Sequence, residues 1–148
     1  MRRIGITGGI GSGKSVVSRL LRIMGYSVYD TDSEAKRLME SSLEVVQKLS
    51  ECFGRDIYHN GRLNRGLLSS RVFGKSDKIV LLNSIVHPVV RFDFYRWSES
   101  LNEEICFVES AILYESRFDE LVDEVWTVTA PEELRISRVR QRSGLTEE

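Results

Sequence analysis

The chain has 148 residues, with 21 Lys and Arg against 22 Asp and Glu and a net charge of −1. This length predicts one domain of ordinary size with a real core, and the balanced charge excludes a general attraction to nucleic acid or membrane surfaces. No apolar run is long enough to span a bilayer, and the first residues predict a strand rather than a signal peptide, so we expect a cytoplasmic protein.

The few cysteines and histidines argue against a disulfide framework and against a zinc site. Cys52 and Cys106 fit no C-x-x-C spacing, and we expect both thiols to be reduced and buried. His59 and His87 are far apart in the sequence and match no zinc-binding pattern.

The first predicted strand, Arg3–Thr7, leads into a glycine-rich segment and then a helix. The segment Gly8-Gly9-Ile10-Gly11-Ser12-Gly13-Lys14-Ser15 matches the pattern G-x-x-x-x-G-K-[ST]. The helix is predicted over Lys14–Met24, with Gly25 at its C′ position. Its apolar residues at helical spacing are Val16, Val17, Leu20, Leu21 and Met24.

This strand–loop–helix context favours phosphate binding over a glycine-rich turn that binds nothing. The glycines let several N–H groups point inward at one phosphate, and the helix adds its positive end. Lys14 is expected to reach the β- and γ-phosphates, and the Ser15 hydroxyl is expected to be a ligand of Mg²⁺. The predicted ATP-binding residues here are Gly8, Gly11, Ser12, Gly13, Lys14, Ser15 and Val16.

A second strand, Tyr26–Tyr29, is predicted to end at Asp30-Thr31-Asp32, where a helix starts with Ala35, Leu38 and Met39 facing inward. Ser41-Ser42-Leu43-Glu44 predicts a capping box for the next helix. Leu43, Val46 and Leu49 are its predicted apolar stripe.

The middle of the chain is basic. Residues 54–78 hold six cations (Arg55, Arg62, Arg65, Arg71, Lys75 and Lys78) against two anions, Asp56 and Asp77. Asn60-Gly61 is a strong turn signal. The helical residues 81–86 precede Pro88, which we expect to break or restart the helix with His87 at the junction.

Two more strands are predicted near the end, Ile105–Val108 and Val125–Thr129, followed by a helix that opens at Ala130-Pro131. Successive β–α units with a glycine loop after the first strand predict an α/β fold with a doubly wound parallel sheet. Ligands bind such sheets at the carboxyl ends of the strands. The residues expected to meet at that edge are Gly8–Ser15, Asp30, Asp32, Glu109 and Thr129.

Asp32 is the best candidate for a catalytic base in phosphoryl transfer, with a helix N-cap as the alternative. Asp30 could support a metal through water. Glu109 stands where an acid near Mg²⁺ is common, or is a solvated strand end.

Arginines at helical spacing offer contacts to phosphate. Arg135, Arg138 and Arg142 share one helix face, which could equally be an ordinary solvated face. Arg65 is the preferred member of the basic stretch for an anionic substrate. For His87 the pattern favours a packed, hydrogen-bonded junction residue over a catalyst.

Taken together, these segments resemble dephospho-CoA kinases, the enzymes of the last step of coenzyme A synthesis, over nearly the whole chain. The matching pieces are Thr7–Ser15, Asp30-Thr31-Asp32, Phe53-Gly54, Gly61-x-Leu63-x-Arg65, Val72-Phe73, His87-Pro88, Ala130-Pro131-Glu132-Glu133 and Arg138-x-x-x-Arg142-x-Gly144-Leu145. The family pattern Pro-Leu-Leu-Phe-Glu is Ala111-Ile112-Leu113-Tyr114-Glu115 here.

The resemblance implies ATP-dependent phosphorylation of the ribose 3′-hydroxyl of dephospho-CoA. It implies Asp32, Lys14 and Arg142 as catalytic residues, and ATP phosphate contacts from Arg138 and Arg142. The substrate-binding residues that we expect are Thr7, Asp32, Arg65 and His87.

The resemblance also implies three parts: a core of about residues 1–30 and 104–130, a helical substrate-binding insertion of about 31–103, and the start of a mobile lid over 131–148. Family members continue beyond Glu148 through the rest of the lid, a strand and a closing helix. We therefore expect a protein ending at Glu148 to be weakly active or inactive, and aggregation-prone, because lid closure excludes water and an uncovered edge strand invites pairing.

The expected partners are a small-molecule substrate and neither nucleic acid nor membrane, and the expected state is a monomer or weak homo-oligomer. Two alternatives stay open. One is a P-loop kinase of another small hydroxyl compound, and the other is a truncated, non-catalytic nucleotide-binding module.

Overall fold

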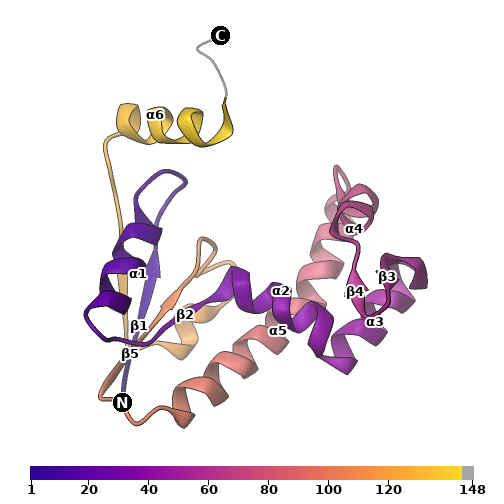
Figure 1. Cartoon of the computed structure of the whole chain (residues 1–148), viewed down its shortest axis with the longest axis horizontal. Coiled ribbons are helices and arrows are strands. Elements are labelled where there is room, and N and C mark those ends of the chain that lie inside the picture. The colour runs from indigo at the N-terminus through magenta and orange to yellow at the C-terminus, as the bar shows by residue number, and fades with distance from the viewer. Residues whose placement is uncertain (145–148) are drawn as a thin grey trace. The chain divides into compact units, whose positions relative to one another are not determined.

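The computed structural model describes residues 1–144 and divides them into two compact units. The first unit comprises residues 1–31 and 97–144, and the second comprises residues 32–96. Figure 1 shows the course of the chain through the labelled elements. The second unit occupies most of the segment that the sequence assigns to a substrate-binding insertion, and that role stays a prediction.

The first unit is built on a parallel sheet, as the alternation of predicted strands and helices requires. Its strands are β1 (Arg2–Thr7), β2 (Val28–Asp30), β5 (Ile105–Glu109) and β6 (Glu124–Thr127), in the order β2-β5-β1-β6. The strand predicted at 26–29 is β2, which begins two residues later and ends one residue later, and the strand predicted at 125–129 is β6, which begins one residue earlier and ends at Thr127. Strand β5 lies between β2 and β1, and Cys106, Phe107 and Val108 of its apolar run are buried.

The register of the sheet brings the carboxyl ends of the strands to one edge. Glu109 of β5 pairs with Ile6 of β1 on one side and with Asp30 of β2 on the other. Thr7 pairs with Thr127 of β6, and the next amide, that of Val128, donates to the Thr7 carbonyl at 2.8 Å. The loop after β1 therefore starts at the same level as Asp30 and Glu109.

Helix α1 (Lys14–Ile23) covers one face of this sheet. Leu21 packs in a cluster with Ile4, Ile6 and Phe107, and Val17 packs against the cluster. The predicted stripe is only partly correct, because Val16, Leu20 and Met24 are exposed. The fully buried Ser18 takes an inward position instead, so the helix contacts the sheet through a narrow face. Gly25 has the predicted C′ role, with φ at 93°.

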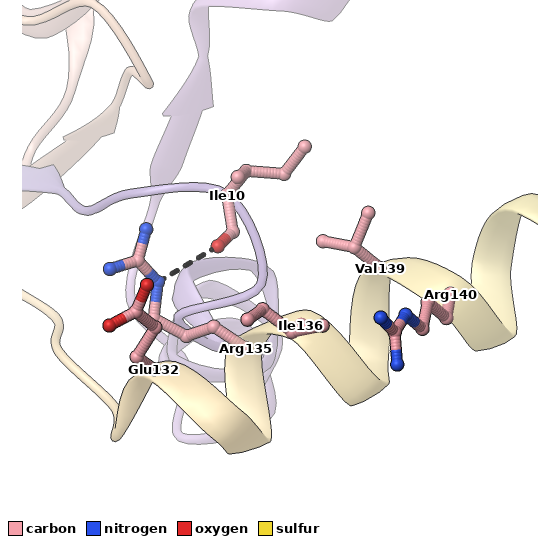
Figure 2. A pocket seen from close by; sticks show the side chains of 6 residues that line it. All are labelled: Ile10, Glu132, Arg135, Ile136, Val139 and Arg140. Carbon is pink, nitrogen blue, oxygen red and sulfur yellow. Dashed lines mark hydrogen bonds between the residues drawn. The ribbon is translucent and has the colours of Figure 1, made fainter. Parts of the chain in front are cut away.

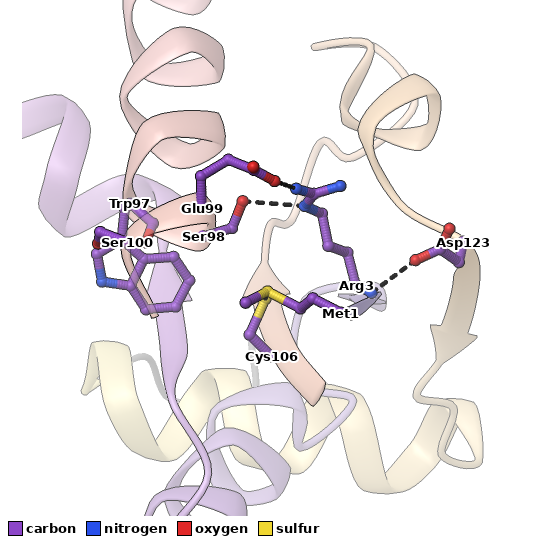
Figure 3. A network of polar contacts seen from close by, with 8 residues as sticks. All are labelled: Met1, Arg3, Trp97, Ser98, Glu99, Ser100, Cys106 and Asp123. Atoms are coloured by element: carbon purple, nitrogen blue, oxygen red, sulfur yellow. Dashed lines mark hydrogen bonds and ion pairs between the residues drawn. The ribbon is translucent and has the colours of Figure 1, made fainter. Parts of the chain in front are cut away.

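Arg3 ties the last turn of α5 (Ser76–Ser100) to the start of β1. Its Nε donates to the buried hydroxyl of Ser98 at 2.9 Å and its Nη2 pairs with Glu99, while its backbone N–H donates to Asp123 at 2.7 Å (Figure 3). These bonds hold the end of α5 against the start of β1, directly after the first unit resumes at Trp97.

The second unit is mainly helical. Its elements are α2 (Thr31–Ser41), whose first residue belongs to the first unit, α3 (Leu43–Phe53), η1 (Arg55–Ile57), the hairpin β3 (Tyr58–His59) and β4 (Arg62–Leu63), α4 (Arg65–Val72), and residues 76–96 of α5. Asn60 and Gly61 form the hairpin turn as predicted, both with positive φ, at 50° and 75°. Buried residues include Val45, Leu49, Phe53, Ile57, Leu68, Val90 and Phe94.

The cap of α3 lies one residue later than the predicted capping box. Ser42 is the N-cap, and its side chain accepts from the Val45 amide at 3.4 Å, whereas Ser41 ends α2. The buried residues of the helix are Val45, Leu49 and Phe53, and Val45 is 1% exposed whereas Leu43, its first residue, is 86% exposed. Leu43 was wrongly assigned to the apolar stripe.

Pro88 does not break the helix, contrary to the expectation from the sequence. Helix α5 runs without interruption from Ser76 to Ser100, with Pro88 inside it. Buried Ile85 and Val86 precede the proline and buried Val90 and Phe94 follow it. Burial on both sides outweighs the roughly 3 kcal/mol penalty of an internal proline.

Candidate active site

The loop between β1 and α1 has the backbone that an anion cradle requires. Gly11 and Gly13 have φ at 74° and 99°, in the left-handed region that favours glycine. A side chain at Gly8 would collide with the Val128 carbonyl oxygen, 2.5 Å from the position of a Cβ. The amides of Val16 and Val17 donate to the Gly13 carbonyl, so α1 starts directly at the loop and points its positive end into it.

The loop encloses a cavity of about 300 Å³. Its lining consists of residues 8–15 together with Ala111 and Arg142. Gly8, Gly11, Ser12, Gly13, Lys14 and Ser15 therefore lie together as predicted for a phosphate site, and Arg142 reaches the same space from α6 (Glu132–Ser143). Val16 lines a neighbouring cavity of about 330 Å³ with Gly13, Arg138, Gln141 and Arg142.

Glu109 connects the end of β5 to the loop. Its Oε1 lies 3.2 Å from Lys14 Nζ and accepts from the Ser15 hydroxyl at 3.3 Å. Lys14 and Glu109 are largely buried, which strengthens the ion pair relative to one in water. Glu109 is thus no solvated strand end. A phosphate that enters the cavity must compete with this carboxylate for Lys14.

Thr31 supports the backbone of Glu109, a role that no pattern in the sequence predicts. The buried Thr31 hydroxyl donates to the Glu109 main-chain carbonyl at 2.9 Å. The bond joins the end of β2 to the end of β5 directly under the carboxylate that contacts the loop. In Asp30-Thr31-Asp32 the two carboxylates are the candidates that residue type suggests, and a hydroxyl between them is not.

The oxygen atoms of Ser15 and Glu109 fit a hard divalent cation. They converge beside the phosphate cavity, and Mg²⁺ is held through one or two such ligands plus water and substrate phosphates. Within residues 1–144 no cluster of three or more His, Cys, Asp or Glu could hold a metal by itself.

The arginines of α6 divide between the cavity and the loop backbone. Arg142 lines the cavity, whereas Arg138 donates from Nη1 to the Gly11 carbonyl at 3.0 Å. Thr7 ends β1 and is buried, with its carbonyl occupied by the Val128 amide. A substrate contact by Thr7 stays a prediction.

The remaining predicted residues lie in the second unit. Asp32 is exposed in the first turn of α2, one residue inside the helix rather than at its N-cap. Arg65 begins α4, with its Nη2 3.8 Å from Glu40. His87 lies in α5, and burial lowers the pKa of its imidazole. Their proposed roles in catalysis and substrate binding stay predictions.

The hairpin of the second unit borders a cavity of its own. The cavity measures about 410 Å³ and is lined by His59, Asn60, Arg62, Leu63 and Asn64. Beside it, the Tyr58 hydroxyl donates to the Met39 carbonyl at 2.6 Å, and burial together with the charge of Glu40 raises the pKa of Tyr58 to about 12. Tyr58 is therefore a neutral structural donor at physiological pH.

Among residues 1–144, no helix combines the length and apolar character needed to cross a membrane.

Comparison with known proteins gives a consistent answer. A dephospho-CoA kinase from Porphyromonas gingivalis is 47% identical over 148 residues, covering the whole of this chain and 73% of the relative. A crystal structure from Thermus thermophilus has a TM-score of 0.80 at 37% identity, over 98% of this chain and 74% of that one. A dephospho-CoA kinase from Campylobacter jejuni shares the fold, with a TM-score of 0.71 at 23% identity over 99% and 75%.

The family model described as dephospho-CoA kinase matches residues 2–148, almost the full sequence. The parallel sheet and the glycine-rich loop with its cavity agree with the nucleotide-binding fold of such a kinase. On these grounds the chain belongs to the dephospho-CoA kinase family.

Proposed function

We propose that this protein transfers the γ-phosphoryl group of ATP to the ribose 3′-hydroxyl of dephospho-CoA, giving CoA and ADP. The observation that carries the proposal is the cavity formed by residues 8–15, in which Lys14 and Ser15 already converge on Glu109. Family membership supplies the acceptor. Neither alternative, another small hydroxyl acceptor or a non-catalytic module, has comparable support.

In the proposed reaction the loop amides and Lys14 hold the β- and γ-phosphates in line with the acceptor. Asp32 takes the proton of the 3′-hydroxyl, the oxygen forms a bond to the γ-phosphorus, and the bond from that phosphorus to the β–γ bridging oxygen breaks. Arg142, which lines the cavity, stabilises the charge that spreads over the transferred group.

Ser15 and Glu109 are the residues that would hold Mg²⁺, Ser15 directly and Glu109 directly or through water. Bound there, the ion would supply positive charge that neutralises part of the charge on the β- and γ-phosphates. Lys14 would then exchange its carboxylate partner for the phosphates.

The test is an ADP-release assay coupled to mass analysis of the acceptor. The chain is incubated with MgATP and dephospho-CoA, adenosine or shikimate in parallel. We expect ADP release above the acceptor-free background only with dephospho-CoA, together with a product that has gained one phosphate. Faster transfer to another acceptor would overturn the substrate assignment. ADP binding with no phosphorylated acceptor in any reaction would favour a non-catalytic module.

A further inference from the structure

We propose that Arg135 is a positioning residue that holds the phosphate-binding loop in its anion-binding form by binding the outer side of the loop. The inference rests on the proposed nucleotide binding at this loop, and it is independent of which acceptor is phosphorylated. Arg135 lies in the first turn of α6, more than a hundred residues after the loop in the sequence.

The first observation is a pair of hydrogen bonds from α6 to consecutive carbonyls of the loop. Arg135 donates from Nε to the Ile10 carbonyl at 3.1 Å, and Arg138 donates from Nη1 to the Gly11 carbonyl at 3.0 Å. Figure 2 shows the Arg135 side chain extending from α6 to that Ile10 oxygen. Amides that point into an anion cradle leave neighbouring carbonyls pointing out, and charged donors satisfy these carbonyls best.

The second observation is close packing of the Arg135 backbone against the loop. A Cβ at Gly11 would lie 2.6 Å from the Arg135 carbonyl oxygen and 3.1 Å from its Cα. A Cβ at Gly9 would lie 2.6 Å from Arg135 Nη2. Side chain and backbone of one residue therefore contact three successive loop residues, and the loop can accept them only because two of these residues are glycine.

Arg135 does not share the position of Arg142. Within the described residues, the lining of the phosphate cavity includes Arg142, whereas Arg135 lines a different cavity of about 350 Å³ with Ile10, Glu132, Ile136, Val139 and Arg140 (Figure 2). Arg135 thus acts on the phosphates through the loop and not by touching them.

This indirect action predicts a particular pattern of affinities. Binding of ADP and binding of ATP both depend on the loop amides. Arg135→Ala should therefore weaken the binding of both nucleotides by the same factor, on the order of tenfold for the loss of a hydrogen bond from a charged donor. Arg135→Lys keeps a cationic donor and should recover part of the loss. A residue that touched the γ-phosphate would weaken ATP binding much more than ADP binding.

The experiment is a calorimetric titration of the chain and its variants with ADP and with a non-hydrolysable ATP analogue, alongside thermal midpoints. Arg19→Ala is the control, since it removes one exposed arginine from α1 and changes net charge equally. We expect Arg135→Ala to lose affinity for ADP and for the ATP analogue by the same factor, and Arg135→Lys to regain part of that affinity. The thermal unfolding midpoints of all the proteins without nucleotide should lie within a few degrees of one another.

Three results would overturn the inference while leaving the proposed function intact. The first is that Arg135→Ala binds ADP and the ATP analogue as tightly as Arg19→Ala does. The second is that Arg135→Ala loses affinity for the ATP analogue but not for ADP. The third is that Arg135→Lys binds both nucleotides no more tightly than Arg135→Ala. Failure of the unsubstituted chain to bind ADP would instead overturn the proposed function itself.

Discussion

Glu109 is the residue on which the resting state of the site depends. Its carboxylate is shared between Lys14 and Ser15, the two side chains that the nucleotide and its metal ion need. The buried Thr31 hydroxyl holds its backbone in place. If the proposed function is correct, we expect the carboxylate to oppose binding of a bare nucleotide, because it competes for Lys14, and to assist binding of the magnesium complex.

Replacing Glu109 by Gln tests this dual role. Without Mg²⁺ the variant should bind ADP more tightly than the parent chain, since Lys14 loses its anionic competitor. With Mg²⁺ the turnover number should fall by about 10- to 100-fold and the Mg²⁺ concentration for half-maximal rate should rise. Titrations in chelator and rate measurements over a Mg²⁺ series provide the readouts. Equal ADP affinity in chelator for both proteins would contradict the account.

Replacing Asp32 by Asn tests the proposed base with little structural disturbance. Asp32 is exposed in the first turn of α2, so the amide should be tolerated there. We expect the turnover number to fall by about 10²- to 10⁴-fold, the usual contribution of a general base. ADP affinity should stay within about twofold of the parent. Steady-state rates and ADP titrations would check both, and near-normal turnover would remove Asp32 from the mechanism.

His87 should make stability depend on pH. Burial lowers its pKa below the ordinary 6.5, so the unfolded chain takes up a proton at pH values where the folded protein does not. The contribution of His87 to the free energy of unfolding is therefore fully present above about pH 6.5. It declines as the pH falls through 6.5 toward the pKa of the folded state. His87→Gln should show a smaller decline in urea midpoint between about pH 7.5 and pH 5.5. Identical pH profiles for the two proteins would exclude this contribution.

At the scale of elements, the sequence was most informative where a local pattern suffices. The glycine pattern with its flanking apolar residues predicted β1, the loop and α1, because turn chemistry and helix capping are set by neighbouring residues. The Asn60-Gly61 hairpin was predicted for the same reason. The uninterrupted helix through Pro88 was not, since buried residues on both sides of the proline decide it.

The buried face of a helix was harder to predict than its existence. In α1 several apolar residues follow one another, and only the packing on Ile4, Ile6 and Phe107 decides that Leu21 points inward while Leu20 does not. The same applies to Glu109 and Arg135, whose bonds to the loop span about a hundred residues or more. Residue types indicated that these groups could bind phosphate or metal, but not that they bind the loop itself.

The contact between α6 and the loop can be tested with two glycines of nearly equal backbone conformation. Gly11 and Gly74 have φ at 74° and 72°, but a Cβ at Gly11 meets the Arg135 backbone, whereas a Cβ at Gly74 meets nothing within 4 Å. Gly74→Ala should lower the free energy of unfolding by about 1–2 kcal/mol, the strain alone. Gly11→Ala should lower it further and weaken ADP binding. Urea unfolding and ADP titration would check both expectations. Equal losses of stability in Gly11→Ala and Gly74→Ala would show that close packing of α6 against the loop does not contribute to stability.

At the scale of the whole molecule, the chain consists of two compact units, and both tryptophans, Trp97 and Trp126, belong to the first. The same unit contains the phosphate-binding loop. Intrinsic tryptophan fluorescence therefore reports on the nucleotide-binding unit, whereas circular dichroism at 222 nm also reports the helices of the second unit.

ADP should accordingly raise the unfolding midpoint seen by tryptophan fluorescence more than the one seen by circular dichroism. At a concentration 100 times its dissociation constant, ADP adds about 2.7 kcal/mol to the unit that binds it. Thermal or urea unfolding with both probes, with and without ADP, measures the difference. Coincident transitions that shift equally would show that the two units unfold as one.

The two cysteines differ in a way that the sequence did not predict for Cys52. Cys106 is fully buried in β5 and burial raises its pKa, which keeps its thiol protonated and unreactive. Cys52 is exposed in α3, in the unit without tryptophan. In this chain both tryptophans, the donor fluorophores, thus belong to one unit and the exposed cysteine, an attachment point for an acceptor dye, belongs to the other, so resonance energy transfer can be measured between the units without an added residue.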